Sequence, residues 1–150
     1  MSLWLREQLT LTLPLAMQAL RAALDAATEQ QVKVSLAIVD GCGLPIHTAH
    51  MDGAPRPAHA IALRKALTAA GFGIATADWE QRLERCSEAV RNGFPLQPGM
   101  ALFGGGEPLR HAGQVIGAIG VSGASEAIDT LCAKAAANHV TTLLQPDRTL

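Results

Sequence analysis

Apolar side chains recur at three- and four-residue spacing between residues 12 and 31, which predicts an amphipathic helix. Thr12 can accept hydrogen bonds from free N–H groups of a first turn, and Pro14 is tolerated in that turn, so we expect the helix to begin here. One face of the helix should pack on a core. The residues of that face are Leu15, Leu20, Ala23, Leu24 and Ala27.

The pattern then changes to that of a β-hairpin. Residues 32–40 are rich in β-favouring side chains and are too few for another helix. Residues 40–43, Asp-Gly-Cys-Gly, suit a tight turn, and residues 44–51 resume an extended pattern. Pro45 indicates that the second strand begins there or lies near a sheet edge.

Two helices are predicted after the hairpin. The first runs from Pro57 to about Gly71 and Gly73, with apolar residues at helical spacing. The second begins at Thr76 and closes at residues 92–93, Asn-Gly. Because it is charged and has few apolar side chains, we expect it to lie outside the core.

Three strands and a last helix follow. Residues 100–103 and 108–110 form two short predicted strands on either side of three consecutive glycines. Residues 114–121 form a longer apolar strand, whose two glycines indicate a central position closely approached by another backbone. A helix then runs to about Leu144. Strands linked by hairpins predict an antiparallel sheet covered by helices, rather than an alternating βαβ arrangement.

Composition supports one folded domain with subunit contacts. The chain has 150 residues, of which 49% are hydrophobic and 17% charged. We therefore expect a single domain over residues 1–150, with a core at about 10–143, and too little polar surface for a free-standing monomer. The formal net charge of -1 provides no basic field to attract nucleic acid or an anionic membrane.

Neither a secretory signal nor a membrane span is visible, which predicts a cytoplasmic protein. The three cysteines, Cys42, Cys86 and Cys132, are odd in number and far apart. This fits neither a disulfide framework nor a CxxC metal site, so we expect buried or partly buried free thiols.

Five motifs in register are similar, in order and spacing, to the GlcG/HbpS-like family, which includes the C-terminal domain of some corrinoid adenosyltransferases. The resemblance covers about residues 10 to 143. The motifs are Ala37-Ile38-Val39-Asp40 with Gly43, Met51-Asp52-Gly53-Ala54, Lys65-Ala66-Leu67-Thr68-Ala69, Gly104-Gly105-Gly106-Glu107-Pro108-Leu109, and Gly117-Ala118-Ile119-Gly120-Val121-Ser122-Gly123 followed by Asp129.

The resemblance implies an α/β (α+β) fold of the profilin-like type, an α/β/α sandwich around a five-stranded antiparallel sheet. It also implies a homo-oligomer, often a tetramer or octamer. Some members bind haem, and one branch is linked to haem degradation and to a sensor kinase. Other members accompany genes of glycolate, propanediol or glycerol metabolism.

Two histidines depart from the common family pattern. Many relatives have arginine before Met-Asp-Gly-Ala where this chain has His50, and often serine where it has His59. Haem iron needs an axial donor, which imidazole can provide. His47 and His50 are three apart on a predicted strand and should face opposite sides. We therefore rank His50 and His59, which flank the turn, above His111 and His139 as haem ligands; for each, a surface or hydrogen-bonded histidine is the alternative.

Other candidate groups are anionic or cationic. Lys65 and Thr68 lie three apart on a predicted helix and would suit a haem propionate or small carboxylate, the alternative being a capped, solvated lysine. Asp52 and Glu107 would form an acid/base pair if the fold joins their turns; a turn-forming Asp and a solvated Glu are the alternative.

The sequence contains no strong motif for a metal site or a catalytic nucleophile. The chain has no HExxH, HxH or paired CxxC, so no dedicated zinc enzyme is predicted. Cys42 would need an imidazole such as His47 to become a nucleophile, and a structural thiol in the turn is favoured. Residues 104–106 lack the Gly-Lys-Ser/Thr of a phosphate loop, which favours a strand bend with room for a neighbouring subunit.

Three functions remain open. The first is a small-molecule binding or accessory protein with haem or another tetrapyrrole as ligand. The second is an enzyme acting on a small hydroxy acid, aldehyde or corrinoid-related metabolite, with Asp52, Lys65 or Glu107 supplying charge. The third is an oligomeric assembly module without a ligand. A haem pocket would also need apolar walls, and the candidates for these are Leu63, Phe72, Phe103 and Ile119.

Overall fold

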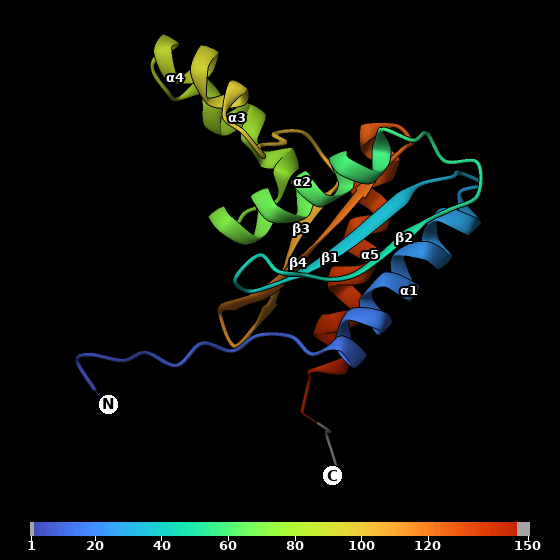
Figure 1. The fold of residues 1–150 in the computed structure, drawn as a ribbon, viewed down its shortest axis with the longest axis horizontal. Helices are drawn as coiled ribbons and strands as arrows, with labels where there is room; N and C mark the ends of the chain where they lie inside the picture. Colours follow the sequence, from blue (N-terminus) through green and yellow to red (C-terminus); the bar gives the residue numbers. More distant parts are fainter. Residues whose placement is uncertain (1, 147–150) are drawn as a thin grey trace.

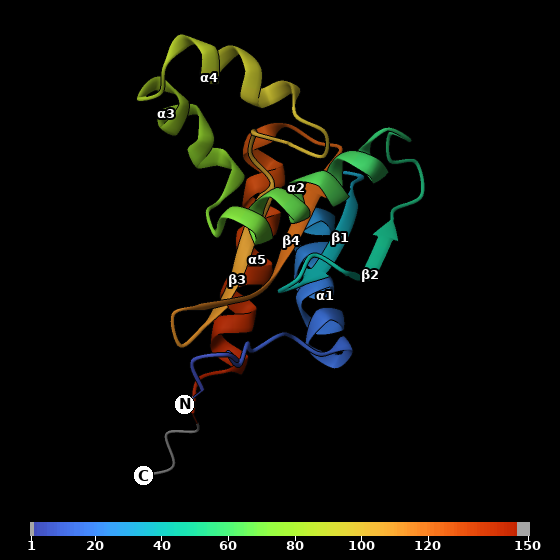
Figure 2. The ribbon, with the colours of Figure 1, turned by 60° about the vertical axis from the view of Figure 1, so that its left-hand side comes forward.

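A four-stranded antiparallel sheet lies between two layers of helices in the computed structural model, which describes residues 2–146 (Figure 1). The strand order is β2-β1-β4-β3. Helix α2 covers one face, and helices α1 and α5 cover the other (Figure 2). The elements are α1 (Leu13–Glu29), β1 (Ser35–Asp40), β2 (Pro45–His50), α2 (Ala58–Phe72), η1 (Thr76–Asp78), α3 (Trp79–Glu84), α4 (Glu88–Gly93), η2 (Phe94–Leu96), β3 (Gly106–His111), β4 (Gln114–Ser122) and α5 (Glu126–Leu143).

This architecture confirms the predicted α/β/α sandwich but corrects the strand count, since four strands rather than five are present in the described residues. Residues 100–103 are not a strand. The amide of Ala101 donates to Thr68 Oγ1 at 3.1 Å, and that of Gly104 donates to Glu126 Oε1 at 2.6 Å. Because these donors are taken by side chains, they are not available to a strand ladder.

The helix ends follow the predicted capping signals. Thr12 Oγ1 accepts from the Leu15 amide at 3.4 Å, which caps α1 where the Thr-x-Pro pattern predicted its start. Helix α2 ends at Gly73, which has a φ of 67° and adopts the left-handed conformation that suits glycine at this position.

The core has two parts, one on each face of the sheet. In the first part, large aliphatic side chains of the strands, including Leu36, Ile38 and Ile119, pack against mainly small side chains of α1 and α5. Small residues make up most of the second part, beneath α2. On Gly120 of β4, a Cβ atom would lie only 1.8 Å from the Ala62 carbonyl oxygen of α2. This confirms the prediction that the glycine-containing strand is central and closely approached by another backbone.

The segment from η1 to η2 projects from the body of the protein (Figure 2). Its anchor is the buried Trp79, whose ring packs against Phe72 with centroids 4.9 Å apart and against Phe94 with centroids 5.1 Å apart. Helix α4 has no buried residue. Most of this segment lies outside the core as predicted, and the exceptions are Thr76 and Trp79, which are buried.

None of the helices among residues 2–146 combines the length and the apolar character that crossing a membrane requires.

Candidate functional site

Two histidines meet at one corner of the sheet. His50 ends β2, His59 lies in the first turn of α2, and both side chains are exposed. Their ring centroids are 6.1 Å apart, with the ring planes at 72°. His50 Nε2 lies 3.2 Å from the Ala54 carbonyl oxygen. A carbonyl oxygen only accepts hydrogen bonds, so Nε2 carries the proton, and in the neutral ring Nδ1 keeps its lone pair for another partner.

Cross-strand pairing explains why His50 and His47 cannot serve one site. His47 pairs with Ile38, whose side chain lies in the core beneath α1 and α5. His50 pairs with Ser35, which is two residues from Ala37 in the core beneath α2. Side chains of paired residues share a face, so His47 and His50 face opposite sides of the sheet, as the three-residue spacing predicted.

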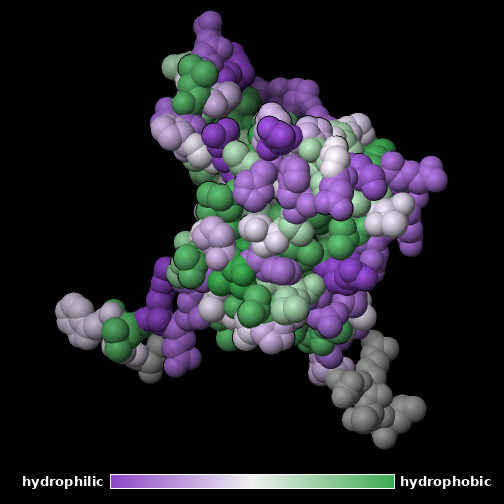
Figure 3. Space-filling model, turned by 45° about the vertical axis from the view of Figure 1, so that its right-hand side comes forward, coloured by the Kyte–Doolittle hydropathy of each residue, from purple (hydrophilic) through white to green (hydrophobic). Residues whose placement is uncertain are grey.

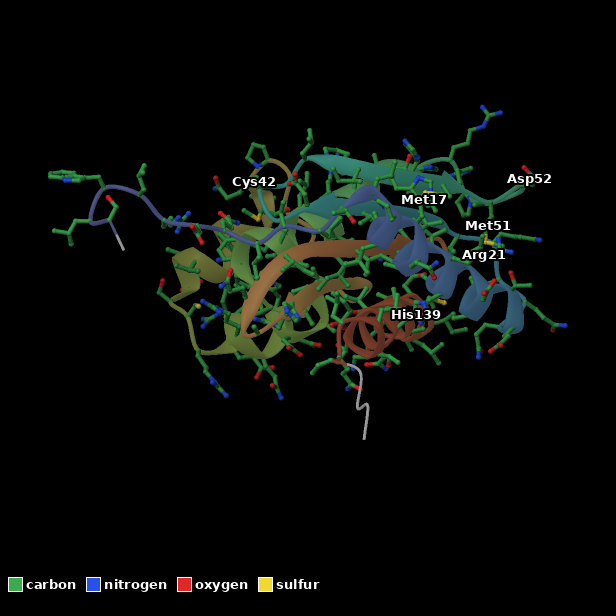
Figure 4. All side chains as sticks on the ribbon, turned by 90° about the horizontal axis from the view of Figure 1, so that it is seen from below. Met17, Arg21, Cys42, Met51, Asp52 and His139 are labelled. Atoms are coloured by element: carbon green, nitrogen blue, oxygen red, sulfur yellow. The ribbon has the colours of Figure 1, made fainter. Side chains whose placement is uncertain are left out.

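Asp52 and Glu107 are not brought together. Asp52 is exposed in the turn after the edge strand β2, whereas Glu107 lies on β3, the opposite edge strand. Figure 4 shows Asp52 at one end of the β1–β2 hairpin, Cys42 at its other end and His139 on α5. The fold therefore does not form the acid/base pair that joined turns would have made within one chain.

Lys65 and Asp129 form an ion pair inside the protein, with side chains that are 2% and 4% exposed. Lys65 Nζ donates to Asp129 Oδ2 at 3.1 Å and to the Val121 carbonyl at 2.8 Å. It also lies 5.1 Å from the centroid of the Phe103 ring. Lys65 is on α2 and Asp129 on α5, so the pair links the two helical layers past the end of β4. Lys65 is therefore not the solvated lysine of the alternative interpretation.

Burial and pairing oppose each other in this ion pair. Burial lowers the pKa of Lys65, and the nearby Asp129 carboxylate partly offsets that shift. Burial also raises the pKa of Asp129, and Lys65 together with the Ala124 amide, which donates to Asp129 Oδ1 at 3.0 Å, counteracts the rise. Each charge thus favours the ionised form of the other, against the effect of burial.

The glycine-rich segment packs over the lysine and leaves no room for side chains. A Cβ atom on Gly105 would lie 2.3 Å from the Val121 carbonyl oxygen and 2.7 Å from Lys65 Nζ. The Gly106 amide donates to Thr76 Oγ1 at 2.8 Å. This donor and that of Gly104 are already used by the protein's own side chains. The segment is therefore built to cover Lys65, and these two amides do not cradle an anion.

Thr68 and Glu107 are both buried near this segment. Thr68 Oγ1 donates to the Arg64 carbonyl at 2.7 Å and accepts from the Ala101 amide, so its hydroxyl is used internally. Glu107 is 9% exposed, and its Oε1 has no hydrogen-bond partner in the described part of the chain. Burial raises the pKa of Glu107, with Lys134 opposing and Asp78 adding to the shift. Glu107 is therefore not the solvated carboxylate of the alternative interpretation.

The proposed apolar walls do not converge. Ile119 lies in the core beneath α1 and α5, whereas Leu63 packs against the core beneath α2. Phe72 and Phe103 are 41% and 47% exposed. The four residues lie on both sides of the sheet and do not line one pocket.

The cysteines are free, as predicted, but their burial differs from the expectation at Cys42, which is exposed in the hairpin turn. Cys132 is buried, and burial raises the pKa of its thiol to about 11. Among residues 2–146, no group of three or more His, Cys, Asp or Glu side chains is arranged to hold a metal ion.

Three residues of the site were not predicted. Asp129, Glu126 and Thr76 accept the hydrogen bonds that hold Lys65 and the glycine segment. Asp129 was visible as the last member of the fifth motif. Thr76 was predicted only as the beginning of a helix and Glu126 was not singled out, because their hydrogen-bond partners lie 30 and 22 residues away.

A family model described as "Haem degrading protein HbpS-like" matches residues 11–138. An uncharacterized 15.0 kDa protein of Citrobacter freundii, from the dhaT-dhaS intergenic region, is 34% identical over 134 residues, which are 85% of this chain and 89% of that protein. The corrinoid adenosyltransferase PduO of Salmonella typhimurium is 33% identical over 108 residues, which are 72% of this chain but only 32% of PduO.

Solved structures share the fold over nearly the whole chain. Klebsiella pneumoniae ORFY superimposes with a TM-score of 0.86 at 30% identity and covers 94% of this chain and 97% of its own. A double mutant of Streptomyces reticuli HbpS gives a TM-score of 0.82 at 33% identity, with 97% and 94% covered. A PduOC–haem complex gives 0.79 at 30% identity, with 87% and 95% covered.

Proposed function

From the premise that this chain belongs to the haem-degrading HbpS-like family, we propose that it is a haem-binding accessory protein, with the His50–His59 corner as its ligand site. Support from related proteins comes from HbpS and from a PduOC structure obtained with haem, both similar over most of this chain. Support from the chain itself comes from the geometry of the two histidines.

The single observation that carries the proposal is the state of the His50 ring. Its Nε2–H is fixed on the Ala54 carbonyl, which is the arrangement that orients a metal-ligating imidazole and leaves the other nitrogen free. The ring centroids of His50 and His59 are 6.1 Å apart, so two imidazoles lie at the same corner of the sheet. Either ring, or both, could hold the iron of a haem.

Haem, when bound, supplies an iron that accepts an imidazole nitrogen and changes oxidation state. His50 would hold the iron through Nδ1, and His59 would be a second donor from α2. Arg56 lies in the turn between them, exposed and free to pair with a carboxylate such as a propionate. Lys65 and Thr68 hold α2 and the glycine segment in place, because their polar atoms are already bonded internally.

The test is a haemin titration followed by the Soret band, with each of the five histidines changed to alanine in turn. The proposal expects saturable binding of one haem per site that His50→Ala and His59→Ala each weaken at least tenfold. It also expects a six-coordinate low-spin spectrum that turns five-coordinate and high-spin in each of these two variants. His111→Ala, on the remote β3–β4 turn, is the matched control and should bind as the unchanged protein does. Loss of binding in His47→Ala or His139→Ala alone would place the site on the other face of the sheet and refute this assignment.

An assembly role is the second candidate. Leu96 is 81% exposed on the projecting segment, which suits a surface covered in a homo-oligomer such as a tetramer or octamer. Within one chain, the fold does not form the acid/base pair on which the enzyme alternative depended, because Asp52 and Glu107 lie at opposite edges of the sheet. Unchanged thermal stability on adding haemin, in a protein of oligomeric mass, would favour assembly over haem binding. A cytoplasmic location remains a prediction.

A further inference from the structure

The turn between β2 and α2 holds the His50 ring. Residues 51–57 connect the two elements at the right-hand side of Figure 1, and Asp52 lies exposed at the tip of this turn (Figure 4). Figure 3, in which this side of the molecule comes forward, shows hydrophilic and hydrophobic residues interspersed over its surface. A site at this corner is therefore distinguished by the way the histidine is held rather than by an apolar surface.

The turn requires a positive φ at its third position. The Ala54 amide donates to the Met51 carbonyl at 3.0 Å, which closes a four-residue turn over residues 51–54. Gly53, the third residue, has a φ of 83°. Glycine adopts this conformation freely and asparagine tolerates it, whereas other side chains are strained there. A Cβ atom on Gly53 would meet nothing within 4 Å, so the requirement for glycine is conformational rather than steric.

The turn presents one carbonyl group in a fixed position. The Ala54 carbonyl oxygen, 3.2 Å from His50 Nε2, belongs to the peptide bond that precedes Pro55. A proline restricts the backbone of the residue before it, which limits rotation of this carbonyl. Ala54 is buried, and the Ala58 amide of α2 donates to the Pro55 carbonyl at 3.0 Å. The acceptor of the His50 proton is therefore held by the turn on one side and by the helix start on the other.

The sheet supports the turn from below. The Met51 amide donates to the Val34 carbonyl at 3.0 Å, which continues the β1–β2 pairing into the turn. A Cβ atom on Gly123, just after β4, would lie 3.5 Å from Pro55 Cδ and 2.8 Å from the Lys33 carbonyl oxygen. The absence of a side chain at Gly123 thus lets the end of β4 pack closely under this corner. The second and fifth sequence motifs meet here.

We propose that Gly53 and Pro55 are positioning residues for His50: together they place the Ala54 carbonyl so that the ring keeps its proton on Nε2 and presents Nδ1 as the iron donor. This inference rests on the proposed haem function. Both residues act through the hydrogen bond to His50 and need no contact with the haem. Partners that fix the tautomer and orientation of a ligating histidine typically change metal affinity by about 10- to 100-fold when they are lost.

The first test is a haemin titration of variants that keep both histidines. Gly53→Ala should weaken binding about tenfold or more, and Gly53→Asn, which tolerates a positive φ, should restore most of the affinity. Gly113→Ala is the matched control, because Gly113 has a φ of 77° and also has no atom within 4 Å of an added Cβ. It lies in the β3–β4 turn, at the end of the sheet opposite His50. Gly113→Ala should lower the melting temperature as Gly53→Ala does, with haemin binding unchanged.

The second test needs no haem. Two-bond nitrogen–proton correlation spectra of the haem-free protein, recorded at about pH 8.5 where imidazoles are neutral, show which ring nitrogen carries the proton. The signal that is missing in His50→Ala identifies His50. We expect its proton on Nε2, exchanging slowly with water, in the unchanged protein and in Gly53→Asn. In Gly53→Ala and Pro55→Ala we expect a mixture of both tautomers with fast exchange.

The outcomes separate this inference from the haem proposal. Haemin binding that depends on His50 but is unchanged in Gly53→Ala would overturn the positioning role and leave the haem site standing. Haemin binding that does not depend on His50 would overturn the haem proposal, and this inference with it. A proton on Nδ1 in the unchanged protein, or the same tautomer in Gly53→Ala as in the unchanged protein, would also refute the positioning role. The spectrum of the unchanged protein remains decisive even if Gly53→Ala does not fold.

Discussion

Replacing Lys65 by methionine should destabilise the protein strongly, because it leaves the Asp129 carboxylate buried without its partner. The substitution keeps the length and apolar stem of the side chain and removes only the ammonium group, which bonds both Asp129 and the Val121 carbonyl. Breaking a buried ion pair by removing one partner costs about 3–5 kcal/mol. For a chain of this size, that lowers the melting temperature by roughly 6 to 20 °C.

The pH dependence separates this electrostatic effect from lost packing. Without Lys65, only the Ala124 and Gly123 amides oppose the effect of burial on Asp129, so its pKa rises further above the ordinary 3.8. The folded variant then binds more protons than the unfolded chain above pH 3.8, so its stability falls as the pH rises through that window. The destabilisation caused by Lys65→Met should therefore be smaller near pH 5 than near pH 8.

Chemical denaturation at both pH values, at equal protein concentration, measures the effect. Lys33→Met, at an exposed position, is the control and should change the unfolding free energy by less than about 0.5 kcal/mol. The double variant Lys65→Met, Asp129→Asn should lose less stability than the sum of the single variants, because no unpaired charge remains. A Lys65→Met protein within about 1 kcal/mol of the unchanged protein at both pH values would refute this account of the ion pair.

Three further predictions concern packing, titration and thiol reactivity. Gly120→Ala should lower the free energy of unfolding by about 3 kcal/mol or more, which is the upper range for overpacking, or abolish soluble expression, because the new Cβ atom meets an α2 carbonyl oxygen. Gly71→Ala, with open space around it, is the control and should leave the melting temperature unchanged or raise it. Glu107→Gln should remove a loss of stability that the unchanged protein shows as the pH rises above 4.5, because the raised pKa of Glu107 makes the folded state bind the extra proton. An equal change in the free energy of unfolding between pH 4 and pH 8 in both proteins, measured by chemical denaturation, would contradict this. Cys42 should react with a maleimide at about pH 7.5 far faster than Cys132, whose buried thiol has a pKa of about 11, and mass spectrometry of the labelled peptides would reveal equal rates if this is wrong.

Periodicity sufficed for most of the fold, since local patterns determine helices and hairpins. The Thr12 cap, the hairpin and the close approach at Gly120 were all predicted from short stretches of sequence. The false strand at residues 100–103 shows the limit of that approach. The amide of Ala101 bonds to Thr68 and that of the following Gly104 to Glu126, and such distant side-chain partners leave no periodic signal.

The site was harder to predict for the same reason. The placement of His47 and His50 on opposite faces of the sheet followed from strand geometry. The buried pairing of Lys65 with Asp129, in contrast, depends on how the strands are ordered in the sheet. A lysine in a helix is usually solvated, and only the three-dimensional arrangement of α2, β4 and α5 surrounds this one. The position of Asp129 in a motif marked it as a conspicuous residue without revealing its partner.

The central strand pair has a consequence for synthesis in the cell. Strand β1 pairs on one side with β4, whose register matches Ser35 with Ser122. A ribosome must therefore make more than three quarters of the chain before the central strand pair can form, and until α5 is added Leu36 and Ile38 are covered only by α1. Truncated or stalled chains that end before β4 should be recognised by chaperones or lost to aggregation, and the complete sheet should assemble only as the last two elements leave the exit tunnel.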